Sequence, residues 1–404
     1  MKVAIVSGGI GKDPGYVPLS FVFNEAYWLA KRGIEVHVVR ERTDRDEFLH
    51  GMFFHGLDRR VSAQAIKMLL SNIFHYPAIS LIRNPLAIYG ENRYAYSVVR
   101  VVKKNNINIV HAHFAYVEGW VGLLARKICR RPLAVTLHGY DILVEPSVGY
   151  GLRLSRRYDE IVRRVIQEAD VVIVQSRAML REVLRISGKG MQGKVFLVPH
   201  GVDVKRFNPL LDASTIRRRH GLEGRFTVFS LRSHRPNYGL EYLIRAIPIV
   251  LKRYPDVVFI IGGDGPLRPY HERLVEALNV RRNVVFTGLI PPREVPLYYA
   301  ASDVVVVPSL QEAWGLVATE AMASGKPVIA TRVGGLVDQV FEGHNGFLVP
   351  PRNPRAIAER IIYYRENPEE AKRMGMNGRR IAERMFDIRR RIDKLIKLYK
   401  ELLH

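Results

Sequence analysis

Short apolar segments alternate with amphipathic segments along most of this chain. Uninterrupted hydrophobic runs such as Val3–Ser7 and Val304–Val307 are typical of strands buried on both faces of a parallel sheet. The segments between such runs, for example Phe21–Lys31 and Leu240–Lys252, have apolar positions three and four residues apart, as amphipathic helices do. The alternation therefore predicts an α/β fold built from doubly wound parallel sheets.

The alternation occurs twice, so we expect two such sheets in tandem. In the first half we predict strands over Val3–Ser7, Glu35–Val39, Ile109–His113, Leu133–Leu137, Val171–Gln175 and Val195–Val198, with helices over Phe21–Lys31, Tyr94–Lys103, Trp120–Ile128, Tyr158–Glu168 and Arg177–Leu184. In the second half we predict strands over Thr227–Leu231, Val257–Ile261, Val284–Thr287, Val304–Val307, Val328–Ala330 and Gly346–Val349, with helices over Leu240–Lys252, Leu267–Leu278, Glu294–Ala300, Leu316–Ala323, Leu336–Phe341 and Pro354–Tyr364.

The length of 404 residues also favours two domains, because single cores stop growing at about 250–300 residues. The turn-rich, basic segment Asp203–Gly224 marks the joint. We expect an N-terminal domain over 1–205, a C-terminal domain over 206–375, and basic amphipathic helices over 376–404 that pack back toward the N-terminal domain.

Composition narrows the class of protein. Hydrophobic residues make up 48% and charged residues 25% of the chain, as in a soluble globular protein. No apolar run approaches the roughly 18 residues of a membrane-spanning helix, and the first apolar run is too short for a secretory signal. Cys129 is the only cysteine, which excludes an internal disulfide framework and fits a reducing cytoplasm.

The formal net charge of +23 favours anionic partners. Candidates are diphosphates, an anionic membrane surface and nucleic acid, but no recognisable nucleic-acid-binding module accompanies the charge, so we expect no nucleic-acid partner. A basic, arginine-rich proteome would explain the same charge without any partner. The alternation of strands and helices is interrupted over residues 61–95, where apolar and basic side chains are mixed. This composition fits either a lipid-facing patch or an ordinary packed helix with its loops.

The stretch Ser309–Glu320 is the most informative part of the sequence. A strand-like run precedes it, a glycine turn lies inside it, and a helix-like run begins after the turn. The first amides of such a helix have no intrahelical acceptor and form a ready anion site. We therefore predict that an anion binds the main-chain amides of Gly315, Leu316 and Val317.

Two carboxylates belong to the same stretch. Glu312 lies in the loop before the predicted helix, and Glu320 lies within the helix. A helix end for a diphosphate, with carboxylates for ribose and hexose hydroxyls, suits a nucleotide sugar. The spacing also arises when one acid lies in a turn and the other on a solvated helix face, so further signals are needed.

Other candidate residues lie at the ends of predicted strands or directly after them, at the edge where open α/β sheets bind ligands. They are Gly8-Gly9, His111 with His113, Thr136–Asp141 with His138, Arg232, and the glycine turn Gly262–Pro266. If the two domains face each other, all of these residues meet in one cleft. Gly8-Gly9 allows close approach of a phosphate or sugar, or simply forms a tight turn, and it lacks the GxGxxG pattern of nicotinamide binding.

The histidines raise the question of a metal. His111, His113 and His138, with Asp141 nearby, are ligand types that transition metals accept. However, no second residue that would orient a coordinating imidazole is evident from the sequence. We predict no metal site and expect at least one histidine to bind sugar or to assist catalysis.

In combination, the motifs of the second half resemble those of the retaining glycosyltransferases of family four. They are, in order, Gly262–Pro266, Val285–Gly288, Ser302–Val304, Pro308-Ser309, Glu312 with Glu320, Glu320–Val328, Val333–Gly335 and Asn345–Val349. The first half is similar more loosely, through Arg32–Val36, His111–Phe114, Thr136–Asp141 and Val198–Asp203. The resemblance is weakest over 40–105 and 376–404. It implies the GT-B fold, in which two Rossmann-like domains face each other across a cleft.

The resemblance also implies roles in sugar transfer. Glu320 would hold the ribose hydroxyls of the donor, and Glu312 would contact the transferred sugar near the reacting carbon. His113 or His138 would line the acceptor side, near the point of transfer. Retention would proceed by same-face attack through an oxocarbenium-like state without a protein nucleophile.

The same resemblance implies how the donor diphosphate is bound. Arg232 would neutralise it, with further contacts to the donor expected from Arg235, Gly9 and Gly263. Such enzymes need no divalent metal, because cationic side chains and a helix end stabilise the leaving diphosphate. We therefore expect a UDP- or GDP-sugar as substrate and no cofactor.

The chain departs from the family pattern in two places. A lysine directly before a glycine commonly follows the family's arginine, whereas here Tyr238 precedes Gly239 and the segment is one residue longer. Either Arg235 replaces the lysine cation or one diphosphate contact is missing. The first glycine loop departs as well, through Lys12-Asp13-Pro14.

We expect a cytoplasmic glycosyltransferase, peripheral on the inner membrane face, that acts in glycolipid or polysaccharide biosynthesis. The basic surface and residues 61–95 favour a lipid-linked or cell-surface glycan as acceptor. A small soluble acceptor, as in disaccharide synthesis, is the alternative within the class. A catalytically silent sugar-nucleotide-binding protein is the alternative outside it, and the intact Glu312, Glu320 and His138 argue against that.

Overall fold

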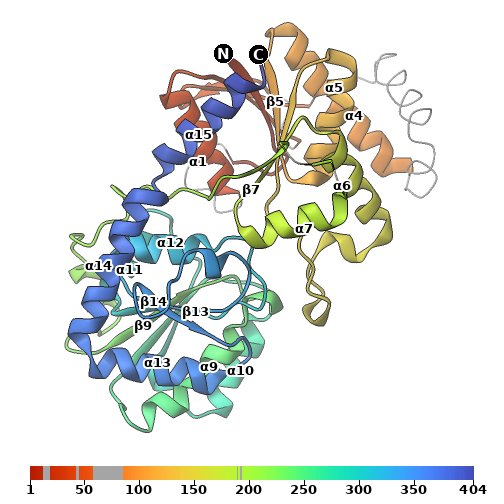
Figure 1. The fold of residues 1–404 in the computed structure, drawn as a ribbon. Coiled ribbons are helices and arrows are strands. Elements are labelled where there is room, and N and C mark those ends of the chain that lie inside the picture. Colours follow the sequence, from red (N-terminus) through yellow and green to blue (C-terminus); the bar gives the residue numbers. More distant parts are fainter. Residues whose placement is uncertain (12–18, 42–44, 58–84, 189, 192) are drawn as a thin grey trace. The chain divides into compact units, whose positions relative to one another are not determined.

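The computed structural model describes residues 1–11, 19–41, 45–57, 85–188, 190–191 and 193–404, which belong to two compact units (Figure 1). The first unit comprises Met1–Val198 and Ile392–His404, and the second comprises Pro199–Arg391. The expected boundary at residue 205 lies slightly after this division. The expected terminal segment 376–404 is shared, because its first part belongs to the second unit and its last part to the first.

The first unit contains an eight-stranded sheet in the order β3-β4-β2-β1-β5-β6-β7-β8. Its strands are β1 Lys2–Val6, β2 Glu35–Val39, β3 Glu47–Leu49, β4 Met52–His55, β5 Ile109–His113, β6 Leu133–Thr136, β7 Val171–Val174 and β8 Val195–Leu197. All neighbours are parallel except β3 and β4, which pair antiparallel at one edge. The sequence missed this hairpin because its strands are short and partly exposed.

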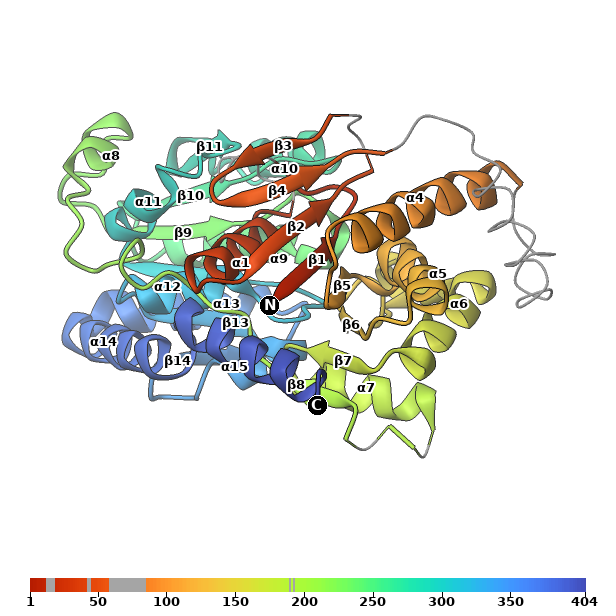
Figure 2. The same cartoon turned by 90° about the horizontal axis from the view of Figure 1, so that it is seen from above.

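The helices of the first unit lie close to the expected positions, except that α4 begins at Pro85 instead of Tyr94. They are α1 Ser20–Lys31, α4 Pro85–Lys104, α5 Trp120–Cys129, α6 Arg156–Glu168 and α7 Arg177–Ser187. Helices α4 and α5 pack side by side, and each contacts strands near the middle of the sheet (Figure 2). The stretch 61–95, for which a lipid-facing patch and an ordinary packed helix were the two interpretations, lies outside the described residues except for its last part, which belongs to α4.

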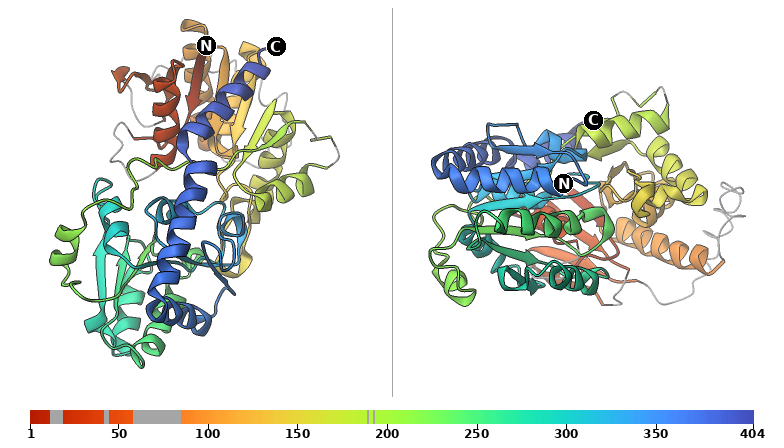
Figure 3. Two further views of the ribbon diagram at one scale, coloured as in Figure 1. Left: turned by 60° about the vertical axis from the view of Figure 1, so that its left-hand side comes forward. Right: turned by 90° about the horizontal axis from the view of Figure 1, so that it is seen from below.

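The second unit contains a six-stranded parallel sheet in the order β11-β10-β9-β12-β13-β14. Its strands are β9 Thr227–Leu231, β10 Val258–Gly262, β11 Val284–Gly288, β12 Val304–Val307, β13 Val328–Thr331 and β14 Gly346–Val349. Its helices are α8 Ser214–Arg219, α9 Leu240–Leu251, α10 Arg268–Ala277, α11 Val295–Ala301, α12 Leu316–Ala323, α13 Pro354–Glu366 and α14 Pro368–Met385. Helix α15, Ile388–Glu401, follows α14 and carries the chain back into the first unit (Figure 3).

One predicted element is wrong. Instead of a helix over Leu336–Phe341, the structure has a short 3₁₀ helix over Gly334–Asp338. The main chain here packs directly on the preceding loop, and the Gly335 amide donates to the Glu312 carbonyl at 3.1 Å. This contact fixes a tight turn where the sequence pattern indicated a regular helix.

The apolar run in β12 explains why the sheet is covered on both faces. Val304 and Val306 belong to the apolar layer formed with α9 and α13, whereas Val305 and Val307 belong to the layer formed with α12. All four side chains are fully buried. Alternate side chains point to opposite faces of a strand, so an uninterrupted apolar run requires helices on both sides.

Each sheet has one point where the strand order reverses. It lies between β1 and β5 in the first unit and between β9 and β12 in the second. Loops that leave the carboxyl ends of such neighbouring strands diverge to opposite faces of the sheet and leave a crevice for ligands. Among the helices that the structure describes, none has both the length and the hydropathy to cross a membrane.

Candidate functional site

The reversal point of the second sheet is occupied by a buried ion pair. Arg232 follows β9 and Glu312 follows β12, and the arginine Nη1 lies 3.0 Å from the Glu312 Oε2. The two side chains are only 6% and 12% exposed. The Ser309 hydroxyl donates to the same carboxylate oxygen at 3.2 Å. The sequence identified both charged residues but not that they bind each other.

Two further nitrogens of the Arg232 guanidinium can still donate hydrogen bonds. Its Nε and Nη2 are buried and have no acceptor among the described residues. The Tyr238 ring lies under the guanidinium, 5.2 Å from ring centroid to Cζ, at the position where a lysine was expected. Buried charged donors without acceptors are costly, so this arrangement favours an incoming oxyanion. Arg235, by contrast, is exposed, and its part in binding stays a prediction.

The beginning of α12 provides the second half of an anion site. Gly315 precedes the helix with φ +97°, a conformation that other residues rarely adopt, and it has no side chain to cap the helix. Helices α7 and α13 are instead capped by Ser176 and Asn353. Within the described residues, no protein acceptor bonds the amides of Gly315, Leu316 and Val317. The predicted helix terminus is therefore open to a ligand.

Glu320 lies one turn further along the same helix. The hydroxyl of the fully buried Tyr299 donates to its Oε2 at 2.8 Å. Burial raises the pKa of the Glu320 carboxyl to about 7, although the Tyr299 hydrogen bond and the charges of Arg206 and Arg232 act in the opposite direction. Because positions four apart share a helix face, this carboxyl lies on the same side of α12 as Leu316.

A buried hydrogen-bond network holds the loop that carries Glu312. The Trp314 indole donates to the Thr319 hydroxyl at 3.1 Å, and this hydroxyl donates to the Gln339 Oε1 at 2.6 Å. The Gln339 amide nitrogen in turn donates to the Trp314 carbonyl. These hydrogen bonds thus close the loop on itself.

Gly263 has a packing function in this structure. Its amide donates to the Gly288 carbonyl at 2.8 Å, and a Cβ in its place would lie 2.0 Å from the Arg232 carbonyl oxygen. The absence of a side chain therefore lets the end of β10 pack against the residue that follows β9. Its predicted contact with a donor stays a prediction.

The reversal point of the first sheet is acidic. The Gly8 amide donates to the Glu118 Oε1 at 2.9 Å, and a Cβ on Gly8 would lie 3.2 Å from the Glu41 Oε2. Burial raises the pKa of Glu118 to about 7. The sequence identified Gly8 and Gly9 but missed both acids. Carboxylates here suit hydroxyl groups better than a phosphate, and the contact of Gly8-Gly9 with a ligand stays a prediction.

Two of the predicted histidines contact each other. His113 Nδ1, at the end of β5, lies 3.0 Å from His138 Nε2, which follows β6. Asp141 is buried and accepts hydrogen bonds from the amides of Ala115, His138 and Gly139, each at 2.9 Å. Its carboxylate therefore braces the loop that carries His138.

Among the described residues, one group has the composition of a metal site. It consists of Glu25, His111 and His113, all buried, with ligand atoms within 4.8 Å of one another. Both ring nitrogens of His111 already have partners, the Tyr399 hydroxyl at 2.6 Å and the Thr136 hydroxyl at 2.7 Å. Hydroxyls thus engage both ring nitrogens of one of the three members, and the expectation that no metal binds here stays a prediction. Glu25 was missed by the sequence analysis, although an acid on the apolar face of a helix was the available signal.

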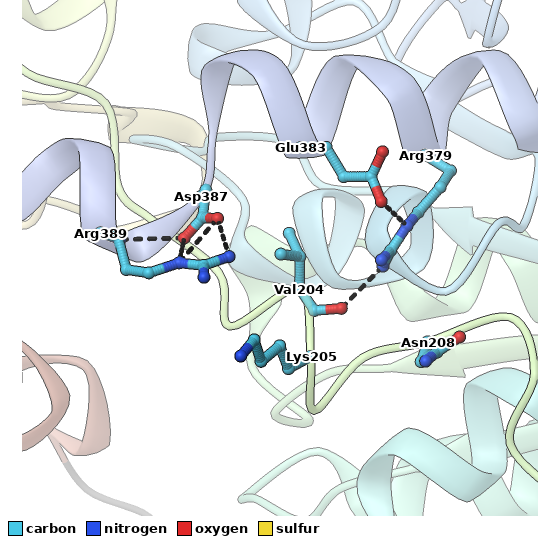
Figure 4. A pocket seen from close by; sticks show the side chains of 7 residues that line it. All are labelled: Val204, Lys205, Asn208, Arg379, Glu383, Asp387 and Arg389. Atoms are coloured by element: carbon cyan, nitrogen blue, oxygen red, sulfur yellow. Dashed lines mark hydrogen bonds and ion pairs between the residues drawn. The ribbon is translucent and has the colours of Figure 1, made fainter.

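A pocket of about 450 Å³ lies in the second unit, at the far end of α12 (Figure 4). It is lined by Val204, Lys205, Asn208, Arg379, Glu383, Asp387 and Arg389. Both acids are bound by arginines, and Arg379 also donates to the carbonyls of Val204 and Ala323. These bonds fasten the segment after Pro199 to α12 and α14, which indicates a structural role.

Two family models together match most of the chain. The model described as Glycosyltransferase Family 4 matches residues 20–206, and the model described as Glycosyl transferases group 1 matches residues 212–381. The chain is 32% identical to a GDP-mannose-dependent alpha-(1-6)-phosphatidylinositol monomannoside mannosyltransferase of Mycolicibacterium smegmatis, over 75% of this chain and 79% of that protein. This chain is a family-four glycosyltransferase.

Other similar proteins agree with this assignment. A D-inositol 3-phosphate glycosyltransferase of Corynebacterium glutamicum is 30% identical to this glycosyltransferase, over 88% of this chain and 84% of that protein. A sucrose-phosphate synthase of Thermosynechococcus elongatus has the same fold, with a TM-score of 0.79 at 25% identity over 99% and 98% of the two chains. The glycosyltransferase therefore has the GT-B fold and uses a nucleotide sugar.

The packing of Gly334 against the Glu312 loop predicts an effect on stability. A Cβ on Gly334 would lie 1.7 Å from the Glu312 carbonyl oxygen, at φ +48°. We expect Gly334→Ala to cost about 3 kcal/mol and to lower the melting temperature by roughly 6–12 °C. Gly343 also has a positive φ, but nothing lies within 4 Å of a Cβ there, so Gly343→Ala is the matched control. Equal melting temperatures of the two variants would contradict the packing argument.

Proposed function

We propose that this glycosyltransferase moves a hexose from a UDP- or GDP-sugar to a hydroxyl of a phosphoinositol-type acceptor, with retention of configuration and without a metal ion. The observation that carries the proposal is the pair of buried donors on Arg232 beside the open terminus of α12. The acceptor's phosphoinositol group belongs either to a lipid or to a free inositol phosphate, and we favour the lipid because of the net charge of +23.

Donor binding uses the groups of the second unit. The Nε and Nη2 of Arg232 donate to the diphosphate, together with the amides of Leu316 and Val317. Glu320 accepts hydrogen bonds from the ribose hydroxyls. As negative charge grows on the departing diphosphate, these fixed donors stabilise it, and they take the place that a divalent ion has in other transferases.

Glu312 acts on the transferred sugar. Its Oε2 is held by Arg232 and Ser309, which leaves Oε1 to accept a hydrogen bond from a hexose hydroxyl near the reacting carbon. A negative carboxylate at this position favours the oxocarbenium-like state. In the retaining mechanism that we propose, the acceptor attacks from the side that the diphosphate leaves, so no side chain forms a covalent bond to the sugar.

The acceptor proposal rests on two relatives and on the first unit. The names of the mycobacterial and corynebacterial relatives both contain a phosphorylated inositol, once in a lipid and once free. In the first unit, His138 and the acidic loop around Gly8 offer groups that bind hydroxyls. A disaccharide synthase, the alternative that the sucrose-phosphate synthase fold suggests, would instead require a free sugar acceptor.

A two-stage experiment tests the proposal. Purified protein is first screened by thermal shift against GDP-mannose, UDP-glucose and ADP-glucose, and a shift that grows with ligand concentration identifies the donor. Transfer from that donor is then measured to free inositol 3-phosphate, to vesicles that contain phosphatidylinositol, and to fructose 6-phosphate, each with and without a chelator. Transfer to either inositol acceptor that survives the chelator is expected. Transfer to fructose 6-phosphate alone, or loss of activity that only a divalent ion restores, would contradict the proposal.

The pKa of Glu320 predicts a pH dependence of donor binding. The carboxylate form accepts ribose hydrogen bonds, and this form is lost as the pH falls through a pKa of about 7. We expect the donor Kd to rise about tenfold per pH unit below pH 7 and to be constant above it. Calorimetric titration of wild type and Glu320→Gln measures this. The variant should bind more weakly and lack the dependence, and an equally pH-dependent Kd would assign the titration to another group.

Glu312 should affect turnover more than donor binding. We expect Glu312→Gln to lower kcat by on the order of 100-fold, because the carboxylate acts on charge that develops only during transfer. The donor Kd should not rise in this variant. Without the Glu312 charge, Arg232 lacks its negative partner and attracts the diphosphate at least as strongly. Glu370→Gln, which removes an exposed ion pair in the same unit, is the control. Unchanged kcat in Glu312→Gln would refute the role of Glu312.

A further inference from the structure

Helix α10 buries a histidine against the loop that carries Arg232. The buried residues of this helix are His271 and Val275. The His271 Nδ1 lies 2.9 Å from the Nδ1 of His234, a fully buried residue two positions after Arg232. The His234 Nε2 is also buried and has no partner in the described part of the chain, so this ring depends on His271 for its hydrogen bond there. An imidazole is costly to bury without such a partner.

One proton joins the two rings. Both atoms of the bond are Nδ1, so one imidazole is protonated at Nδ1 and donates, while the other has its proton on Nε2 and accepts. Burial lowers the pKa of both histidines, that of His271 to about 4, and thereby keeps both rings neutral at neutral pH. The pair is therefore a hydrogen bond between two neutral imidazoles of opposite tautomer.

The main chain of His234 runs along the glycine turn that follows β10. The His234 amide donates to the Asp264 carbonyl at 2.9 Å, and the Leu267 amide donates to the His234 carbonyl at 2.9 Å. A Cβ on Gly265 would lie 2.9 Å from both the amide nitrogen and the carbonyl oxygen of His234. The loop after β9 is thus bound at one residue twice, to the turn through its main chain and to α10 through its side chain.

Arg232 lies between two places where this loop is held. On one side the Arg232 amide continues the sheet and donates to the Gly262 carbonyl at 2.9 Å. On the other side the loop is held at His234. The guanidinium between them lies 3.0 Å from the Glu312 carboxylate and over the Tyr238 ring. If His234 left its buried place, the loop would be held on one side only, and the guanidinium would spend part of its time away from this position.

We infer that His234 and His271 are positioning residues for Arg232: their hydrogen bond keeps the loop after β9 in the conformation in which the guanidinium receives the donor diphosphate. The inference rests on the proposed function, which gives Arg232 that role. It assigns a part in donor binding to a side chain of α10, outside the motifs that carry the family resemblance.

Loss of the His271 ring would leave the His234 Nδ1 buried without a partner. An unsatisfied buried group costs its full desolvation penalty, so the loop would open part of the time and let water reach the ring. A donor that binds only the ordered loop would then meet a smaller competent fraction, and its Kd would rise by the inverse of that fraction. Saturating donor would restore the ordered loop, so the effect is on donor affinity and not on kcat.

Three variants of the full-length protein test the inference. His271→Leu removes the partner of His234. His271→Asn keeps a partner, because the asparagine amide places an oxygen or an NH₂ group close to the position of the histidine Nδ1. Val275→Ala is the matched control, since Val275 is the other buried residue of α10 and its side chain cannot form a hydrogen bond. Circular dichroism and melting temperatures establish that each variant is folded.

Hydrogen exchange followed by mass spectrometry reads the loop without a donor. We expect peptides that cover residues 232–239 to exchange at least about tenfold faster in His271→Leu than in wild type. In His271→Asn and Val275→Ala the same peptides should exchange within about twofold of the wild-type rate. Unchanged exchange in His271→Leu would overturn the inference, and so would equally fast exchange in Val275→Ala, which would assign the effect to α10 as a whole.

Kinetics with the donor found above provide the second readout, at pH 8, where Glu320 is ionised. We expect the donor KM to rise about tenfold in His271→Leu, with kcat and the acceptor KM within about twofold of wild type. His271→Asn should restore the donor KM. An unchanged donor KM in His271→Leu, or a loss of kcat that saturating donor does not restore, would overturn the positioning role. If wild type binds no donor, the proposed function fails, whereas hydrogen exchange still decides whether the pair holds the loop.

A measurement on the wild-type protein keeps the inference testable if His271→Leu does not fold. In protein labelled with ¹⁵N-histidine, long-range nitrogen–proton NMR spectra distinguish the two protonated nitrogens, and His271→Asn identifies the signals of His271. At pH 8 we expect two neutral rings, one protonated at Nδ1 and the other at Nε2. Both rings protonated at Nε2, or a positively charged ring, would overturn the hydrogen bond on which the inference is built.

Discussion

The ion pair between Arg232 and Glu312 is the interaction on which the second unit's site depends. Each residue follows one of the two strands that flank the reversal point of the sheet, so their contact joins the two loops that leave to opposite faces. A buried ion pair alone contributes little net stability, because both charges lose water. Its value here is geometric. It fixes the guanidinium while two of its nitrogens still lack acceptors in the described structure, and it fixes one carboxylate oxygen while the other is left for a ligand.

The surroundings of this pair are preorganised by main-chain packing. Gly263 lets the end of β10 approach the Arg232 carbonyl, and Gly334 lets the 3₁₀ turn approach the Glu312 carbonyl. The hydrogen bonds among Trp314, Thr319 and Gln339 then hold the loop before α12. The groups around the ion pair are therefore in place without a ligand, and such preorganisation of donors is the general condition for strong electrostatic stabilisation of a transition state.

The buried polar groups of the first unit include several acids and histidines. Its reversal point is surrounded by Glu118 and Glu41, and its histidines are linked into chains that begin at carboxylates. Acids near the loops favour hydroxyl-rich ligands, whereas the second unit presents cationic and amide donors to phosphates. The two units thus differ in the charge of the groups around their reversal points.

The sequence by itself determined the buried parallel strands and the family, because such strands are apolar on both faces and site residues lie at their ends, whereas the short hairpin β3–β4 was missed. It also identified Arg232, Glu312, Glu320 and the helix terminus at Gly315. Tertiary structure alone decided that Arg232 binds Glu312, that Tyr238 stacks where a lysine was expected, and that Glu25 and Glu118 reach the histidines and the first glycine loop. The physical reason is range: apolar periodicity is a local property of the chain, whereas the pairing of a buried charge depends on residues that are distant in sequence and meet only when the sheet has formed.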